Sequence, residues 1–203
     1  MTESSSSATT ARRLLIVGPP GAGKGTQAAR LAESLQIEAI STGDIFRSNI
    51  KGETELGLLA QQYTAKGELV PDEVTNAMVR DKLASKVAAG EQGFILDGYP
   101  RNVAQVAELD TILTDLGLTL DGAVEITADP EIVVERLLGR AEIEGRADDT
   151  EPVIRHRLSV YAEQTAPIAR LYAERGALAQ VDGIGSVDEV TTRLLGALDQ
   201  LHS

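Results

Sequence analysis

A glycine-rich run between an apolar stretch and a helix-forming segment constrains this chain more than any other feature. The run extends from Gly18 to Thr26 with the sequence GPPGAGKGT, and it directly follows the apolar residues LLIV. In the order strand, turn, helix, the pattern G-x-x-x-x-G-K predicts a loop whose backbone N–H groups cradle phosphate oxygens. A Cβ at Gly21 or Gly23 would obstruct that approach, and Lys24 adds a positive charge beside a helix N-terminus. The sequence therefore predicts a nucleoside triphosphate site rather than a fortuitous glycine turn.

The candidate metal ligands depart from the usual pattern of this loop. Gly25 stands after Lys24, where a Ser or Thr would ligate Mg²⁺ directly, and the hydroxyl comes one place later at Thr26. Direct metal ligation by this loop is therefore not expected, and the candidate metal residue is Asp97, which ends an apolar run and is expected at the carboxyl end of a buried parallel strand. A carboxylate there would hold Mg²⁺ through water, although Asp97 could instead cap a helix or turn.

Composition and charge exclude several classes of function. The chain has 203 residues, a net charge of −12 and no Cys. It therefore has no disulfide and no thiolate zinc site, and its acidity opposes binding to nucleic acid or anionic lipid. No apolar run is long enough to span a membrane. Residues 1–11 are rich in Ser and Thr without the apolar segment of a secretory signal, so we expect a disordered tail before a single cytoplasmic domain over residues 12–203.

Strand and helix signals alternate along the chain. Apolar runs near residues 13, 38, 94, 123 and 178 are separated by segments with helical spacing. This alternation predicts an α/β fold in which a five-stranded parallel sheet lies between two helical layers, with ligands at the carboxyl ends of the strands.

Two segments after residue 140 are less regular. Residues 141–149 show no periodicity and predict a short mobile loop. Residues 150–175 predict one long helix with a kink before Pro167. On that helix Arg155 and Arg157 lie on different faces, so only one of them can point toward a ligand.

Basic residues fall at expected strand ends, helix starts and the loop, in an otherwise acidic chain. They are Lys24, Arg47, Arg101, Arg136, Arg140, Arg146 and Arg157. One triphosphate would not need so many cations, whereas two phosphorylated substrates meeting end to end would. An acceptor phosphate is already ionised near neutral pH, so transfer to it needs no general base. Arg47, which follows the helix-capping sequence STGD, could alternatively be an ordinary surface residue.

Several motifs together resemble the adenylate kinase family. They are the loop GPPGAGKGT, the sequence STGD followed by Arg47, DGYPR at residues 97–101, GR at 139–140 and RADD at 146–149. They stand in that family's order over nearly the whole chain from residue 12, and the combination is far more specific than any single motif.

The resemblance implies the reaction ATP + AMP ⇌ 2 ADP with Mg²⁺, catalysed by a monomer with no nucleic-acid or membrane partner. It implies an ATP site of Gly21, Ala22, Gly23, Lys24, Gly25, Thr26, Arg136, Arg140 and Gly185. It implies an AMP site of Thr42, Arg47, Glu68, Leu69, Val70, Gly98, Tyr99, Pro100, Arg101, Gln105, Arg146 and Arg157. It implies catalytic roles for Lys24, Arg101, Arg136, Arg140, Arg146 and Arg157.

The same resemblance implies a helical insert over residues 41–70 that binds the monophosphate, with Gln105 reading the adenine, and a short lid over residues 141–149. The long-lid form of the family often holds zinc through cysteines, and the short spacing here implies neither that lid nor zinc. The nearest alternative is a UMP/CMP kinase, against which Thr42 and Gln105 favour AMP. A nucleotide-operated switch would lack a reason for both Arg47 and Arg101, and a nucleic-acid-binding ATPase is opposed by the net charge.

Overall fold

The computed structural model describes residues 12–144 and 150–201 of the chain. Within them, one parallel sheet is formed by the strands β1 (Arg13–Val17), β2 (Glu38–Ser41), β3 (Phe94–Asp97), β4 (Gly122–Thr127) and β5 (Leu178–Asp182). Their order in the sheet is β2-β3-β1-β4-β5. The predicted α/β fold is confirmed, while the expected tail at residues 1–11 and Arg146 lie outside the described residues.

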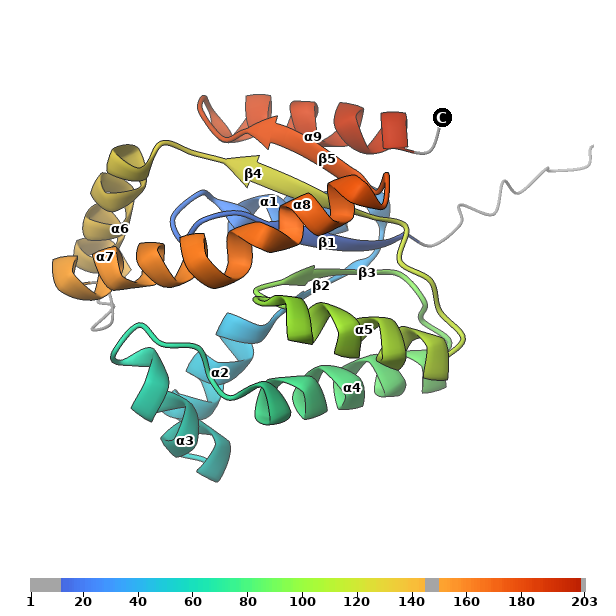
Figure 1. Ribbon diagram of the computed structural model, residues 1–203, viewed down its shortest axis with the longest axis horizontal. Coiled ribbons are helices and arrows are strands. Elements are labelled where there is room, and N and C mark those ends of the chain that lie inside the picture. The colour runs from blue at the N-terminus through green and yellow to red at the C-terminus, as the bar shows by residue number, and fades with distance from the viewer. Residues whose placement is uncertain (1–11, 145–149, 202–203) are drawn as a thin grey trace, which may run out of the picture.

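The two faces of the sheet are both buried, as the alternating direction of strand side chains requires. Leu14 and Ile16 pack with α1 (Lys24–Leu35) and α9 (Val187–Leu201) on one face. On the other face, Leu15 and Val17 share a core with α4 (Asp72–Ala88), α5 (Val103–Asp115) and α8 (Ala166–Glu174). Figure 1 shows the resulting three layers, with α1 and α9 on one side of the sheet and α4, α5 and α8 on the other.

Helices α2 (Thr42–Lys51) and α3 (Glu55–Thr64) form a small lobe at one end of the sheet (Figure 1). The lobe has an apolar core of its own around Phe46, Ala60 and Val70. Helix α2 begins where the sequence predicts, because the Ser41 hydroxyl accepts a hydrogen bond of 3.2 Å from the Asp44 backbone N–H. This cap fixes the direction in which the chain leaves β2.

The segment after β4 differs from the sequence prediction at two points. Helix α6 (Pro130–Glu144) continues four residues beyond Arg140, so the loop predicted from residue 141 is wrong for residues 141–144. Ala and Glu favour a helix, and the first residue that disfavours one is Gly145. The long helix predicted from residue 150 is divided into α7 (Glu151–Val160), a π-helical turn η1 (Tyr161–Thr165) and α8.

The predicted irregularity before Pro167 is thereby confirmed in the form of a widened turn. Proline lacks the N–H that would bond to the preceding turn, and its ring crowds the carbonyl there. No helix within residues 12–144 and 150–201 combines the length and apolar character that crossing a bilayer requires.

Candidate active site

A cleft of about 770 Å³ opens at the carboxyl ends of β1 and β3. Its walls come from the loop after β1, the α2–α3 lobe, the end of β3, and helices α6 and α7. Of the site residues expected from sequence, those that line it are Gly21, Gly23, Lys24, Gly25, Thr26, Thr42, Arg47, Glu68, Leu69, Val70, Asp97, Gly98, Pro100, Arg101, Gln105, Arg136, Arg140 and Arg157. The fold therefore brings together residues spread over more than a hundred positions of the sequence.

The glycines of the loop after β1 serve two different purposes. Gly23 has φ of 91°, and a Cβ added there would meet no atom within 4 Å, so its side-chain position is open. Gly21 has φ of 82°, but a Cβ there would lie 2.8 Å from Cγ of Leu137 on α6. The sequence argument that a Cβ at Gly21 would obstruct a phosphate is therefore incomplete, because that Cβ would first collide with α6.

Lys24 is a partly buried amine in a strongly cationic setting. Its Nζ donates a hydrogen bond of 2.9 Å to the carbonyl of Pro19, so the side chain folds back across its own loop. Burial lowers the pKa of Lys24 to about 8, with a further lowering by nearby Arg101, Arg157 and Arg140 that Asp97 partly opposes. An anion that entered the cleft would restore the ordinary preference for the charged form.

Arg101 is the second partly buried cation of the cleft. Burial lowers its pKa, and the positive charges of Arg157 and Arg47 lower it further, against an opposing effect of Asp97. Its Nε donates a hydrogen bond of 2.7 Å to the carbonyl of Gly98. Several cations within electrostatic reach of one another raise the positive potential of the cleft, so the arrangement favours a polyanionic ligand.

The carbonyl of Gly98 accepts two hydrogen bonds and so connects the end of β3 to the α2–α3 lobe. Besides Arg101, it accepts a hydrogen bond of 2.9 Å from the hydroxyl of Thr42, which is 1% exposed. A Cβ on Gly98 would lie 2.7 Å from that hydroxyl oxygen and 2.9 Å from a guanidinium nitrogen of Arg101. On the lobe, Arg47 lines the cleft and pairs with Asp44.

Gln105 lies at the start of α5 with its side chain enclosed by polar partners. Its Oε1 accepts a hydrogen bond of 2.7 Å from the Arg101 backbone N–H, and its Nε2 donates one of 2.6 Å to Oδ1 of Asp72. Sequence reasoning did not single out Asp72, which is the first residue of α4. It also missed Thr165, whose hydroxyl donates a bond of 2.7 Å to the Arg101 carbonyl from the π-helical turn. Neither contact joins residues close in sequence, so no local signal reveals it.

Arg155 and Arg157 are separated by the helix as expected. Arg157 lines the cleft, whereas Arg155 is half exposed and pairs with Glu151 at 3.0 Å one turn earlier on α7. On α6, Arg136 also lines the cleft and donates a hydrogen bond of 3.3 Å to the carbonyl of Gly183. Helices α6 and α7 thus add cations opposite the lobe.

Some expected site residues do not line the cleft. Ala22 and Tyr99 are buried, and the Tyr99 hydroxyl donates a hydrogen bond of 2.7 Å to Oδ1 of Asn76. Gly185 lies in the loop between β5 and α9, outside the residues that line the cleft. Arg146 falls outside the described residues. For these residues, binding roles stay sequence-based predictions.

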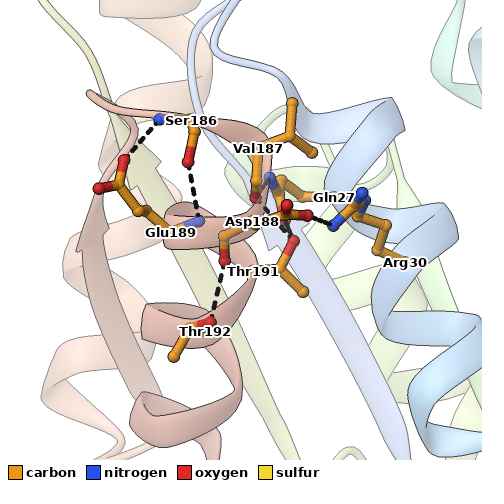
Figure 2. A network of polar contacts seen from close by, with 8 residues as sticks. All are labelled: Gln27, Arg30, Ser186, Val187, Asp188, Glu189, Thr191 and Thr192. Carbon is orange, nitrogen blue, oxygen red and sulfur yellow. Dashed lines mark hydrogen bonds and ion pairs between the residues drawn. The ribbon is translucent and has the colours of Figure 1, made fainter.

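The loop between β5 and α9 is nevertheless fixed against the glycine-rich loop. A Cβ on Gly183 would lie 2.9 Å from the Thr127 carbonyl and 3.4 Å from the Ala22 carbonyl. Figure 2 shows the second attachment, in which Gln27 on α1 contacts the first turns of α9. Its Nε2 donates a bond of 3.0 Å to the Val187 carbonyl, and its Oε1 accepts one of 2.7 Å from Thr191. The two segments therefore keep a constant separation.

The donor set suits a magnesium ion that arrives with a nucleotide. Within residues 12–144 and 150–201 there is no group of three His, Cys, Asp or Glu side chains able to hold a metal. Asp97 and Thr26 line the same part of the cleft, and a Cβ on Gly25 would lie 3.7 Å from a carboxylate oxygen of Asp97. Mg²⁺ commonly takes one carboxylate, waters and phosphate oxygens, so a single acidic side chain beside a phosphate loop fits it.

Comparison with known proteins connects this geometry to one family. A family model described as Adenylate kinase matches residues 16–177. A protein named adenylate kinase from Kocuria rhizophila is 61% identical over 188 residues, which cover 93% of this chain and 99% of the relative. Adenylate kinases of Pseudarthrobacter chlorophenolicus and Thermobifida fusca are 58% and 56% identical, each over 92% of this chain and over 96% and 97% of their own length. The resemblance predicted from the motifs is confirmed.

Proposed function

Because this chain belongs to the adenylate kinase family, we infer that it catalyses reversible transfer of the terminal phosphoryl group from ATP to AMP, giving two molecules of ADP. The observation that carries this function is the convergence of buried and half-buried cations on one cleft beside a phosphate-binding loop. Lys24 lies on the side of the cleft formed by the loop after β1, and Arg101 lies on the side toward the α2–α3 lobe. Two phosphorylated substrates placed end to end would fill the space between them.

We propose that ATP binds with its phosphates on the loop after β1. The backbone N–H groups from Gly21 to Thr26 and the ammonium group of Lys24 bind phosphate oxygens, and Arg136 and Arg140 approach from α6. Asp97 would hold, through water, the Mg²⁺ that accompanies the nucleotide, and that ion would neutralise part of the charge on the phosphates. Gly185 is proposed to lie beside the adenine of ATP, and the packing of Gly183, in the same loop, close to the Ala22 carbonyl supports this placement.

AMP is proposed to bind between the lobe and the end of β3. The guanidinium groups of Arg47 and Arg101 hold its phosphate, because a planar fork of donors matches phosphate oxygens. Thr42, Gln105 and the chain from Glu68 to Val70 surround the base, with Gly98 and Pro100 completing the wall. Tyr99 is included on sequence grounds, because it is buried and does not line the cleft. Arg146 is included on sequence grounds alone.

Transfer then requires positioning and charge stabilisation but no general base. The attacking oxygen belongs to a phosphate that is already ionised near neutral pH. Negative charge on the transferred group is shared among Lys24, Arg140 and Arg157, which lie within electrostatic reach of one another. Placing the two substrates in line supplies much of the remaining rate enhancement.

The assembly state and location form part of the same proposal. We propose a monomer acting in the cytoplasm on small nucleotides rather than on nucleic acid. A net charge of −12 opposes contact with a polyanionic backbone. Light scattering during size-exclusion chromatography tests the monomer.

A pair of substitutions on α7 tests the cation cluster. Arg157→Ala removes a cleft-facing guanidinium, and we expect kcat/KM for AMP to fall about a hundredfold or more, as for other transition-state cations. Arg155→Ala makes the same change two residues away at an exposed surface pair and should leave kcat/KM unchanged. Equal activities of the two variants in a steady-state assay would show that the cluster does not act on the reaction.

A further inference from the structure

We propose that Asp72 sets the base specificity of this enzyme through Gln105, by fixing the side-chain amide in the orientation that pairs with adenine and rejects 6-oxopurines. The inference rests on the proposed role of Gln105 as the residue that reads the AMP base. Asp72 does not line the cleft, so it is a positioning residue that acts through its neighbour.

The two contacts of the Gln105 side chain have opposite polarity. At one end, the Arg101 backbone N–H donates to Oε1 at 2.7 Å, and at the other end Nε2 donates to Asp72 at 2.6 Å. Turning the amide by half a rotation would place Nε2 against an N–H and Oε1 against a carboxylate. A carboxylate oxygen cannot donate, and the side chain is only 1% exposed, so water could not relieve either clash. The network therefore determines which amide atom is oxygen and which is nitrogen.

Asp72 is itself held in place from α5. The amide of Asn102 donates to both carboxylate oxygens, at 3.0 Å and 3.2 Å. The Oδ1 of Asn102 in turn accepts a bond of 2.8 Å from the backbone N–H of Gln105. The start of α4 and the start of α5 thus share one closed set of hydrogen bonds, so the carboxylate cannot turn away without breaking several of them.

The fixed amide favours one class of purine. After its two contacts, Gln105 retains one N–H and one oxygen lone pair for a ligand. Adenine offers an amino donor at position 6 beside an acceptor ring nitrogen, which matches an amide oxygen beside an amide N–H. Hypoxanthine carries an acceptor oxygen at position 6, which would face Oε1 and repel it. IMP therefore isolates the effect of the amide orientation on base preference, because IMP differs from AMP only at position 6 and in the proton on N1.

The test measures kcat/KM for AMP and for IMP with ATP as donor. In Asp72→Asn, the new amide can turn and donate to Oε1, which removes one of the two clashes of the flipped orientation and leaves only that of Nε2 with the Arg101 backbone N–H. We expect the preference for AMP over IMP to fall about tenfold, with the KM for ATP unchanged. Asp72→Ala removes the acceptor altogether and should also lower the preference. Glu73→Gln makes the same charge change at the exposed neighbouring residue and should leave the preference at the wild-type value.

Two contrary outcomes have different meanings. If both Asp72 variants keep the wild-type preference while Gln105→Leu abolishes it, Gln105 reads the base but Asp72 does not orient it, and this inference is overturned. A lowered melting temperature with an unchanged preference leads to the same conclusion, because it shows a purely structural role. If Gln105→Leu also keeps the wild-type preference, the base-reading role itself is wrong, and the inference falls with it.

Discussion

Lys24 carries an amine that is charged in water, but it lies in an environment that disfavours a positive charge. Its ammonium group is desolvated by the surrounding protein, and Arg101, Arg157 and Arg140 add positive potential, so its pKa falls from 10.5 to about 8. Between those two values an unfolded chain would bind more protons than the folded one, so stability rises with pH in that window. Below about pH 8 the buried ammonium destabilises the empty enzyme. Such strain is expected where a site is built for an anion.

ATP binding should therefore take up a proton in mildly alkaline solution. Phosphate oxygens stabilise the ammonium form, so the pKa of Lys24 rises above about 8 when the nucleotide binds. At about pH 9 the free enzyme is mostly neutral at this residue and the complex is mostly charged. Isothermal titration calorimetry in two buffers of different ionisation enthalpy measures the uptake. Uptake of the same size in Lys24→Met would assign the proton to another group.

At the scale of elements, α1 and α9 are joined by a short polar network drawn in Figure 2. The Thr191 hydroxyl lies 2.7 Å from Oε1 of Gln27 and 2.8 Å from the Val187 carbonyl, and its side chain is nearly buried. Arg30 and Asp188 form an exposed ion pair beside it. Such exposed pairs contribute little, so the buried hydroxyl is the stronger link between the helices.

Thr191→Val should lower the free energy of unfolding by about 1 kcal/mol, because the isosteric change removes one buried donor and leaves the Gln27 oxygen unsatisfied. Thr192→Val on the same helix loses only an exposed hydroxyl that donates to the Asp188 carbonyl, so it should cost less than about 0.5 kcal/mol. Urea unfolding of both variants measures the difference. Equal losses would mean that the network does not connect the helices energetically.

The elements were largely predictable from sequence because their signals are local. The apolar run ending at Val17, the cap at Ser41 and the irregularity before Pro167 each depend on a few adjacent residues. The end of α6 was not predictable by the same route. Residues 141–144 lack an apolar stripe, but they contain neither Gly nor Pro, and the helix continues through them.

At the scale of the whole molecule, the parallel sheet explains why the candidate site could be located from sequence. Carboxyl ends of parallel strands meet at one edge, so the glycine-rich loop and Asp97 had to lie close together. The supporting contacts could not be predicted in this way. Asp72 meets Gln105 across 33 positions and Thr165 meets Arg101 across 64, and each contact depends on how helices pack.

Positive and negative charge are unevenly distributed over the whole molecule. A chain with a net charge of −12 places Lys24, Arg101 and Arg157 around one cleft, while exposed residues such as Arg155 and Arg175 are paired with carboxylates. Positive potential is thereby concentrated where phosphates bind, and the remaining acidic surface repels larger polyanions. We therefore expect the molecule to attract nucleotides without attracting nucleic acid.

The most direct test of this account is phosphoryl transfer from Mg²⁺-bound ATP to AMP, UMP, CMP and GMP in parallel, with a reaction lacking any acceptor as the control. The account predicts a strong preference for AMP, formation of ATP and AMP from ADP in reverse, and little hydrolysis without an acceptor. Preference for UMP or CMP would contradict the assignment of Thr42 and Gln105 to the base. Hydrolysis alone would contradict the acceptor site itself.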